Sequence, residues 1–331
     1  MALVVAGLAI GLLLVEATAR LGGLADPPRL GAEFDRSPAL FFAEPERQHP
    51  WSRGAAETFT IAVIGDSFTV GEGVQHDDAY PARLERLLNL NAEAPPAEVR
   101  TYARSGTSTH FQLRFLRQAV AEGPQMILLG IFLNESENFR VGAWRAELEP
   151  RVPGGWRLTL LRASHAGTWL YGRLEQRRIR GAWVEYMHRI WDPDFEGYRR
   201  FERALAVFAG TASDIGVPLL ALVLPPAGAL GGTYPFAFVH ERIHRALEGQ
   251  QIPFLDLLEM LSGRSEVRLA VLPGLDGHYN EIAHRIVAEA IFGHLLREGY
   301  LPAVYGPRLA TVQAEEMWLR RLRKAREILP P

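Results

Sequence analysis

The chain has 331 residues, of which 48% are hydrophobic, so it can bury the core of one large domain with attached segments. Its formal net charge of −2 supplies no basic field that would gather nucleic acid, and we expect no nucleic-acid partner. With no cysteine in the sequence, disulfides, cysteine nucleophiles and thiolate metal sites are excluded.

The chain begins with an apolar segment. Residues 2–15 are uninterrupted apolar sequence, and residues 1–24 together are long enough to cross the hydrocarbon core of a membrane. Glu16 and Arg20 are four apart and would share a helix face, where they can pair near the membrane boundary. A cleaved signal peptide is the alternative, since Ala17-Thr18-Ala19 resembles a cleavage site. We predict a transmembrane anchor, in contact with membrane lipid, over residues 1–24.

The body of the chain follows a proline-rich linker or arm at residues 25–57. Over residues 58–300, short apolar runs alternate with amphipathic stretches, the pattern of βαβ units around a parallel sheet. Five strands with helices between them predict an α/β, flavodoxin-like, doubly wound sandwich. We expect strands at 59–64, 98–102, 126–133, 217–223 and 252–256, and helices at 79–90, 109–121, 196–213, 236–249 and 280–297.

Two regions depart from this alternation. Residues 139–195 carry five of the seven tryptophans, and such a long insertion after a strand suggests a cover for the active site, a docking surface or a helical subdomain. The C-terminal tail, residues 301–331, contains an amphipathic stretch with Trp318 and Leu322 against several arginines. That stretch is interpreted as an ordinary solvated helix or as a contact with anionic lipid or a partner.

Ser67 stands where the first apolar strand ends, in the run Gly65-Asp66-Ser67-Phe68. In an open parallel sheet the carboxyl end of a strand opens into the binding crevice, so this serine would be displayed to a ligand. Turn chemistry alone also places Gly, Asp and Ser at strand ends, so the run does not by itself establish a nucleophile.

His278 lies far along the chain, in Asp276-Gly277-His278-Tyr279-Asn280. A serine hydroxyl needs a base to take its proton, and an imidazole near neutral pH suits that role. Asp276 is two residues from His278, so both side chains would project to one side of an extended segment, where the carboxylate can orient the ring. Asn280 would then cap the helix that follows.

Hydrogen-bond donors for an oxyanion follow two further strands. Asn134 ends the strand at 126–133 and supplies a neutral side-chain donor at the same sheet edge as Ser67. Gly106 follows the strand at 98–102, and its backbone N–H is another candidate donor.

The order of these motifs resembles the SGNH (GDSL-type) serine hydrolases, over about 240 residues. The resemblance implies Ser67 as nucleophile, His278 as base and Asp276 as its orienting acid. It also implies the Ser67 N–H, Gly106 and Asn134 as oxyanion donors. Membrane-anchored members with Asp-x-His-x-Asn are especially similar, and some of them act outside the cytoplasm. Glu135 departs from the pattern, because aspartate often follows the family's asparagine.

Two functions are consistent with these features. The first is a serine-dependent acyl-ester hydrolase or acyltransferase at a membrane surface, with its soluble domain in the periplasm or otherwise outside the cytoplasm, acting on an acyl ester or an acylated saccharide. The second is an accessory or scaffold subunit of a larger integral-membrane complex, such as a respiratory or photosynthetic assembly, that uses the fold without significant catalysis. The anchor, the insertion 139–195 and the tail would then contact the partner.

We expect no cofactor and no metal. His240 and His244 are four apart on a predicted helix, a spacing that can bind metal, but the sequence shows no carboxylate arrangement nearby that completes a site. The glycines after Ser67 lack the basic and hydroxyl partners of a phosphate-binding loop.

Overall fold

The computed structural model describes residues 2–22, 58–91, 93–137, 146–148, 151, 153–230, 233–264, 266–272 and 276–306. The chain divides into two compact units. The helical unit comprises Met1–Pro45 and Phe139–Arg189, and the sheet unit comprises Glu46–Asn138 and Ile190–Pro331. The linker predicted at residues 25–57 lies outside the described residues, as does the tail from residue 307 onward.

The sheet unit is built on a five-stranded parallel sheet with the strand order β2-β1-β3-β4-β5. This order is that of flavodoxin-like folds, and the predicted α/β fold with five parallel strands is confirmed. The strands are β1 (Phe59–Gly65), β2 (Ala97–Ala103), β3 (Met126–Phe132), β4 (Leu219–Leu224) and β5 (Phe254–Asp256).

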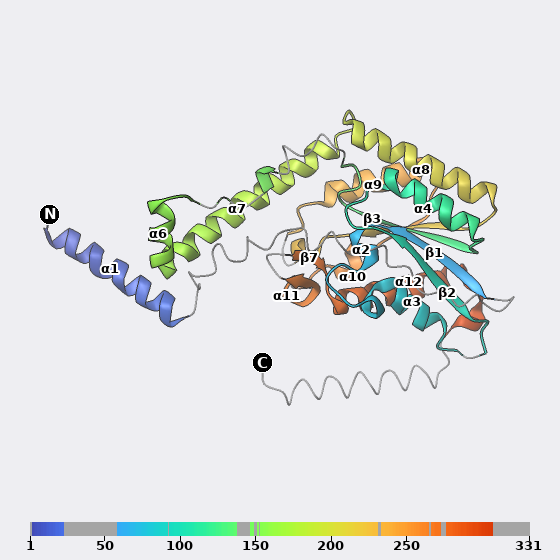
Figure 1. The fold of residues 1–331 in the computed structure, drawn as a ribbon, viewed down its shortest axis with the longest axis horizontal. Coiled ribbons are helices and arrows are strands. Elements are labelled where there is room, and N and C mark those ends of the chain that lie inside the picture. The colour runs from blue at the N-terminus through green and yellow to red at the C-terminus, as the bar shows by residue number, and fades with distance from the viewer. Residues whose placement is uncertain are drawn as a thin grey trace. The chain divides into compact units, whose positions relative to one another are not determined.

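Helices cover both faces of this sheet, which explains why its central strands are apolar throughout. Every residue of β3 and of β4 is buried. Figure 1 shows α4, α8 and α9 on one face and α3 and α12 on the other. These helices are α3 (Tyr80–Leu88), α4 (Thr109–Ala121), α8 (Glu196–Asp214), α9 (Ala237–Gly249) and α12 (Glu281–Arg297).

Shorter elements lie in the connections of the sheet unit. They are α2 (Ser67–Val70), α10 (Leu258–Leu261) and α11 (Glu266–Leu269), with 3₁₀ turns at His76–Asp78, Ala227–Ala229 and Ala303–Tyr305. The antiparallel pair β6 (Ala270–Leu272) and β7 (Asp276–Tyr279) precedes α12. Asn280 caps α12 as predicted, because its side chain accepts hydrogen bonds from the backbone N–H groups of Ile282 and Ala283.

Buried polar contacts join α2, α3 and α12 beneath the first strand. The hydroxyls of Thr69 and Tyr80 lie 2.9 Å apart, and the backbone N–H of Tyr80 donates to Nδ1 of the buried His284 at 3.2 Å. Gly130 in β3 leaves the space that this arrangement needs. A Cβ atom there would lie 2.6 Å from Thr69 Oγ1, closer than real side chains approach.

The helical unit contains α1 (Ala2–Leu21), α6 (Trp156–Ala163), α7 (His165–Ile190) and a 3₁₀ turn at Ala146–Leu148. Within the described part of the chain, no helix is sufficiently long and apolar to span a membrane.

Glu16 and Arg20 pair on α1 as their spacing predicted, at 2.7 Å, and both also contact the α6–α7 junction. The carboxylate of Glu16 accepts hydrogen bonds from the Ser164 hydroxyl and from the backbone N–H groups of His165 and Ala166. The hydrogen bond from His165, followed by that from Ser164, lowers the pKa of Glu16 to about 2. Glu16 thus acts as a distant N-cap for α7, where a helix end attracts negative charge.

Candidate active site

Ser67 is held at a sharp turn between β1 and α2. Asp66 is the N-cap of α2, and its carboxylate accepts a hydrogen bond from the backbone N–H of Phe68 at 3.0 Å. Gly71 ends the short helix with φ of 80°, a left-handed conformation that glycine adopts without strain. The Ser67 side chain therefore emerges at the carboxyl end of β1, and the residue is 9% exposed.

His278 reaches Ser67 from β7, 211 residues further along the chain. Its Nε2 atom lies 2.9 Å from Ser67 Oγ, within hydrogen-bond distance. Asn280 fixes the end of the strand that carries this histidine, because its side-chain amide also donates to the backbone oxygens of Arg268 and Ala270. The structure thus brings together the two residues that the sequence analysis placed at the centre of the site.

The ring of Phe68 packs against the imidazole of His278. Its ring centroid lies 4.8 Å from that of His278, and it stacks on Phe132 at 3.9 Å. Tyr279 packs edge-on against the ring of Phe68, with 4.9 Å between the two centroids. Phe68 is buried, so the packing restricts the positions that the histidine ring can take.

Glu72 is a site residue that the sequence analysis missed. Its Oε2 atom lies 3.8 Å from His278 Nε2. The backbone N–H of Glu72 donates to the Ser67 carbonyl at 3.1 Å, which fixes where the side chain begins. A carboxylate at this distance favours the protonated imidazole. The only sequence signal was an acidic residue five positions after Ser67, a spacing that carries no pattern of its own.

Two buried carboxyl groups lie behind the site. Burial raises the pKa of Asp66 to about 7, although the Phe68 N–H and the nearby His278 lower it. Its Oδ2 atom has no hydrogen-bond partner among the described residues. Burial also raises the pKa of Glu135 well above its usual range, and the charge of Asp66 raises it further. Two such groups resist ionising together.

Glu135 links the end of β3 to the start of α4. Its carboxyl oxygens accept hydrogen bonds from the Thr109 hydroxyl at 2.8 Å and from the Gln112 amide at 3.2 Å. A glutamate spans this gap at the position where the family pattern often has the shorter aspartate. The adjoining backbone is tied as well, because Trp191 Nε1 donates to the Leu133 carbonyl at 2.6 Å.

The predicted oxyanion donors lie at neighbouring strand ends. The order β2-β1-β3 places Gly106 after β2, Ser67 after β1 and Asn134 after β3, all at the carboxyl edge of the sheet. Gly106 has φ of 74°, and a Cβ atom there would meet nothing within 4 Å. Asn134 Oδ1 is buried without a hydrogen-bond partner among the described residues. This side chain is therefore not held by a hydrogen bond through its oxygen.

Asp276, the predicted orienting acid, is placed only in part. Its backbone forms the first residue of β7, two residues before His278, and its side chain lies outside the described residues. Together, a displayed serine, a histidine in contact with it and donors at adjacent strand ends make up an arrangement able to perform acyl transfer.

Several solved structures resemble this chain, all at low identity. A lipolytic protein of the G-D-S-L family from Desulfitobacterium hafniense is 13% identical and has a TM-score of 0.44; the match covers 71% of this chain and 98% of that one. The psychrotrophic esterase EstA from Pseudoalteromonas is 12% identical and has a TM-score of 0.44; the match covers 73% of this chain and 100% of that one. An acetylxylan esterase from Geobacillus stearothermophilus is 16% identical and has a TM-score of 0.45; the match covers 78% of this chain and 98% of that one.

No family model and no curated protein sequence matches the chain.

Proposed function

We propose that this protein is a serine-dependent acyl-ester hydrolase or acyltransferase. The observation that carries the proposal is the 2.9 Å separation between Ser67 Oγ and His278 Nε2. A serine hydroxyl and an imidazole nitrogen at this distance are the nucleophile and base of covalent acyl transfer. Their convergence from segments 211 residues apart is not a product of local turn chemistry.

The first chemical step transfers a proton from Ser67 Oγ to His278 Nε2 as the oxygen attacks the acyl carbon of the ester. Glu72 stabilises the imidazolium that forms, being 3.8 Å from the same nitrogen. The N–H groups of Ser67 and Gly106 and the side-chain amide of Asn134 donate to the oxyanion of the tetrahedral intermediate. One such donor in a preorganised site contributes on the order of 3 kcal/mol to transition-state stabilisation.

The second step releases the acyl group. His278 returns its proton to the leaving alkoxide, which leaves an acyl-enzyme on Ser67. Water or a sugar hydroxyl then gives its proton to His278 and attacks the acyl carbon. The bond from the acyl carbon to Ser67 Oγ breaks and His278 returns the proton to that oxygen, so the product is either a free acid or a new ester. An acyl ester or an acylated saccharide is the proposed substrate, and exclusion of water from the site would select transfer over hydrolysis.

A fluorophosphonate probe tests the nucleophile directly, since it labels only an activated serine. We expect the wild-type protein to be labelled, Ser67→Ala to be unlabelled and the exposed Ser213→Ala on α8 to be labelled as the wild type is. Circular dichroism of the Ser67 variant would establish that it is folded. Equal labelling of the wild type and folded Ser67→Ala would exclude Ser67 as the nucleophile.

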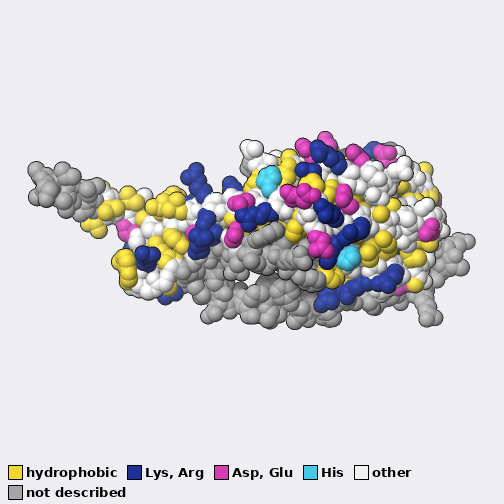
Figure 2. Space-filling model, turned by 90° about the horizontal axis from the view of Figure 1, so that it is seen from above, with side chains coloured by type: hydrophobic (Ala, Val, Ile, Leu, Met, Phe, Trp, Pro, Cys, Tyr) yellow, Lys and Arg dark blue, Asp and Glu magenta, His cyan; other side chains and the backbone are white. Residues whose placement is uncertain are grey.

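A second candidate function, the accessory subunit of a larger membrane complex, is favoured by the surface of the helical unit. Figure 2 shows hydrophobic side chains over the part of this unit formed by α1 and α6. Monomeric proteins seldom expose many large apolar side chains together. The exposed ones here include Leu12, Leu13, Leu14, Trp156, Leu160, Leu170 and Leu174.

Native-membrane extraction separates the two candidates. Under the accessory-subunit proposal, the protein co-migrates with integral-membrane subunits, and Leu160→Glu with Leu170→Glu releases it. A lone protein that turns over p-nitrophenyl acetate supports the enzyme instead. Location at an extracytoplasmic membrane surface stays a prediction from the sequence, which fractionation of the producing cells would test.

A further inference from the structure

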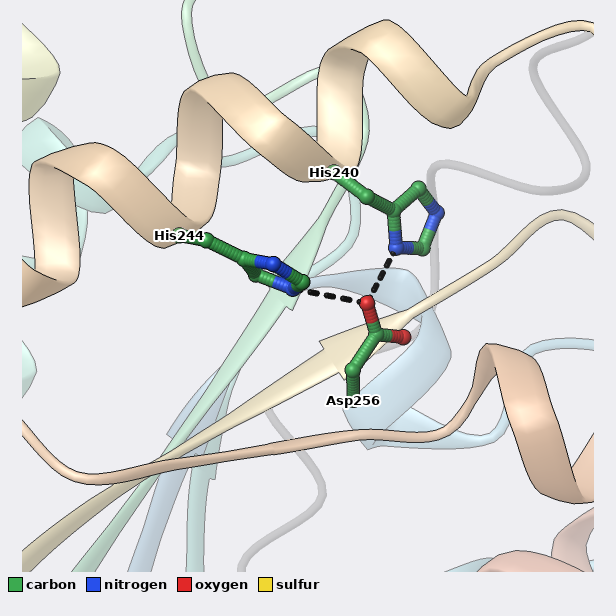
Figure 3. A group of neighbouring side chains, drawn as sticks. All are labelled: His240, His244 and Asp256. Carbon is green, nitrogen blue, oxygen red and sulfur yellow. Dashed lines mark hydrogen bonds and ion pairs between the residues drawn. The ribbon is translucent and has the colours of Figure 1, made fainter.

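Three side chains with metal-binding atoms converge at the carboxyl end of β5. His240 Nδ1 lies 2.6 Å and His244 Nε2 lies 2.8 Å from the same oxygen, Asp256 Oδ2. Figure 3 shows both imidazoles leaving α9 toward this carboxylate. The three atoms all lie within 4.8 Å of one another. From the sequence no metal was expected, since no carboxylate near these histidines completes a site. Asp256 is 12 residues beyond His244, and the fold brings its carboxylate to them.

The surrounding structure holds each of these groups in place. Asp256 Oδ1 accepts a hydrogen bond from the Leu258 N–H at 2.8 Å, which turns Oδ2 toward the histidines. The ring of His244 stacks on Phe254, with 4.5 Å between centroids. His240 is 3% exposed and its other nitrogen, Nε2, lies 2.7 Å from the Tyr234 hydroxyl.

We propose that His240, His244 and Asp256 bind one divalent transition-metal ion of the zinc class, which joins α9 to β5. Two imidazoles and one carboxylate are ligands that zinc accepts, whereas magnesium and calcium prefer oxygen ligands alone. Side-chain exposures of 29% for His244 and 19% for Asp256 leave the site open to an ion and to a water molecule as fourth ligand.

The existing distances fit this ion after a small adjustment. Tetrahedral ligands about 2.1 Å from zinc lie roughly 3.4 Å from each other. The nitrogen–oxygen distances therefore open by about 0.8 Å for His240 and about 0.6 Å for His244 when the ion replaces the hydrogen-bonding protons. The two ring nitrogens, which lie within 4.8 Å of each other, adopt the same separation of roughly 3.4 Å. Rotation of the His244 side chain, which is the more exposed of the two histidines, supplies part of this movement.

Metal binding changes the tautomers of His240 and His244 without the loss of a proton from either ring. Both imidazoles donate a proton to Asp256 in the metal-free arrangement. Binding requires a lone pair on His240 Nδ1 and on His244 Nε2, so each proton moves to the opposite ring nitrogen. Protonated His240 Nε2 then donates to the Tyr234 hydroxyl oxygen, the type of outer hydrogen bond that metal-binding histidines usually make.

This site is separate from Ser67. Both lie at the carboxyl edge of the sheet, but β3 and β4 stand between β1 and β5. At about 4.8 Å per strand, the two sites are roughly 14 Å apart. Zinc binding can therefore be measured without reference to ester turnover, and failure of either proposal leaves the other in place.

Calorimetric titration of the full chain with zinc chloride, after treatment with EDTA, tests the site. We expect one zinc ion per chain, and a rise of roughly 5 °C in the thermal midpoint when free zinc is about 100 times its Kd. Co²⁺ in place of zinc would give the visible absorption of a nitrogen- and oxygen-ligated ion. Because the chain contains no cysteine, thiolates contribute nothing to either signal.

Two variants and a matched control decide the result. His244→Ala weakens zinc binding by more than about 100-fold, and Tyr234→Phe, which keeps all three ligands, weakens it by roughly 10-fold. His110→Ala, at an exposed histidine on α4, binds as the wild type does. The proposal is overturned if the wild type shows no saturable binding, or if zinc binds folded His244→Ala as tightly as the wild type. Should His244→Ala not fold, undiminished affinity in Tyr234→Phe would overturn it.

Discussion

The backbone N–H of Tyr80 donates a hydrogen bond to Nδ1 of His284, 3.2 Å away. An accepting Nδ1 carries a lone pair, so this buried ring is neutral with its proton on Nε2. Burial lowers the pKa of His284 to about 3, whereas burial raises the pKa of Asp66 to about 7. The two groups thus change the free energy of unfolding with opposite signs as the pH varies.

His284 makes the fold less stable in acid. Its folded pKa is below the unfolded value, so the unfolded chain binds the extra proton and the free energy of unfolding falls as the pH drops from about 6.5 toward 3. His284→Asn keeps an acceptor near the position of Nδ1 and does not titrate. Between pH 7 and 5 this variant should lose about 2 kcal/mol less than the wild type. Urea denaturation at both pH values measures the difference, and parallel losses would contradict it.

Asp66 has the opposite effect on the free energy of unfolding, because it makes the fold less stable as the pH rises. Its folded pKa is raised, so its contribution to stability is complete below about pH 4 and is lost as the pH rises through 7. Asp66→Asn retains an oxygen for the Phe68 N–H and removes the ionisation. From pH 5 to pH 8 the wild type should lose about 3 kcal/mol more than this variant in urea unfolding. Identical pH dependence of the two proteins would refute the assignment.

Glu135 can be tested through its hydrogen bonds. Glu135→Ala leaves the Thr109 hydroxyl and the Gln112 amide without their acceptors and opens a cavity, so unfolding in urea should become easier by about 3 kcal/mol. Glu135→Gln should stay within about 1 kcal/mol of the wild type. Gln112 can turn its amide, because its Oε1 has no partner among the described residues. A glutamine variant as unstable as the alanine variant would argue against this hydrogen-bonding role.

Phe68 is expected to position His278. Phe68→Leu keeps most of the buried volume but removes the ring that lies 4.8 Å from the imidazole. We expect fluorophosphonate to label this variant about 10-fold more slowly than the wild type, since the base is less well oriented. Phe115→Leu, at another buried phenylalanine, on α4, is the matched control for lost stability and should label at the wild-type rate. Equal slowing in both variants would mean that only stability changed.

The parallel sheet was predictable because its strands are buried on both faces and appear as apolar runs. The predicted strand at 126–133 matches β3 (Met126–Phe132), and the helix predicted at 109–121 matches α4. The β6–β7 pair was missed because strands of three and four residues are too short for an alternating pattern to be recognised. Among the described residues no helix is long and apolar enough to cross a membrane, and the anchor expected over residues 1–24 stays a prediction from the sequence.

The contact between Ser67 and His278 was predictable because Ser67 follows a recognisable strand end and His278 precedes a capped helix. Glu72 and the grouping of His240, His244 and Asp256 were not, because each depends on a distance across the fold that no spacing in the sequence encodes. Asp66 was visible as part of the motif, but its raised pKa follows from burial, which only the folded structure supplies.

The hydrogen bond from Trp191 to the Leu133 carbonyl ties together the chain just before and just after the long segment that joins β3 to α8. When the two ends of a long insertion are joined in this way, the entropic cost of closing the insertion grows only slowly with its length. Such a segment is therefore exchangeable during evolution. A change in its length leaves the sheet and the strand ends around Ser67 in place at a small cost in folding free energy.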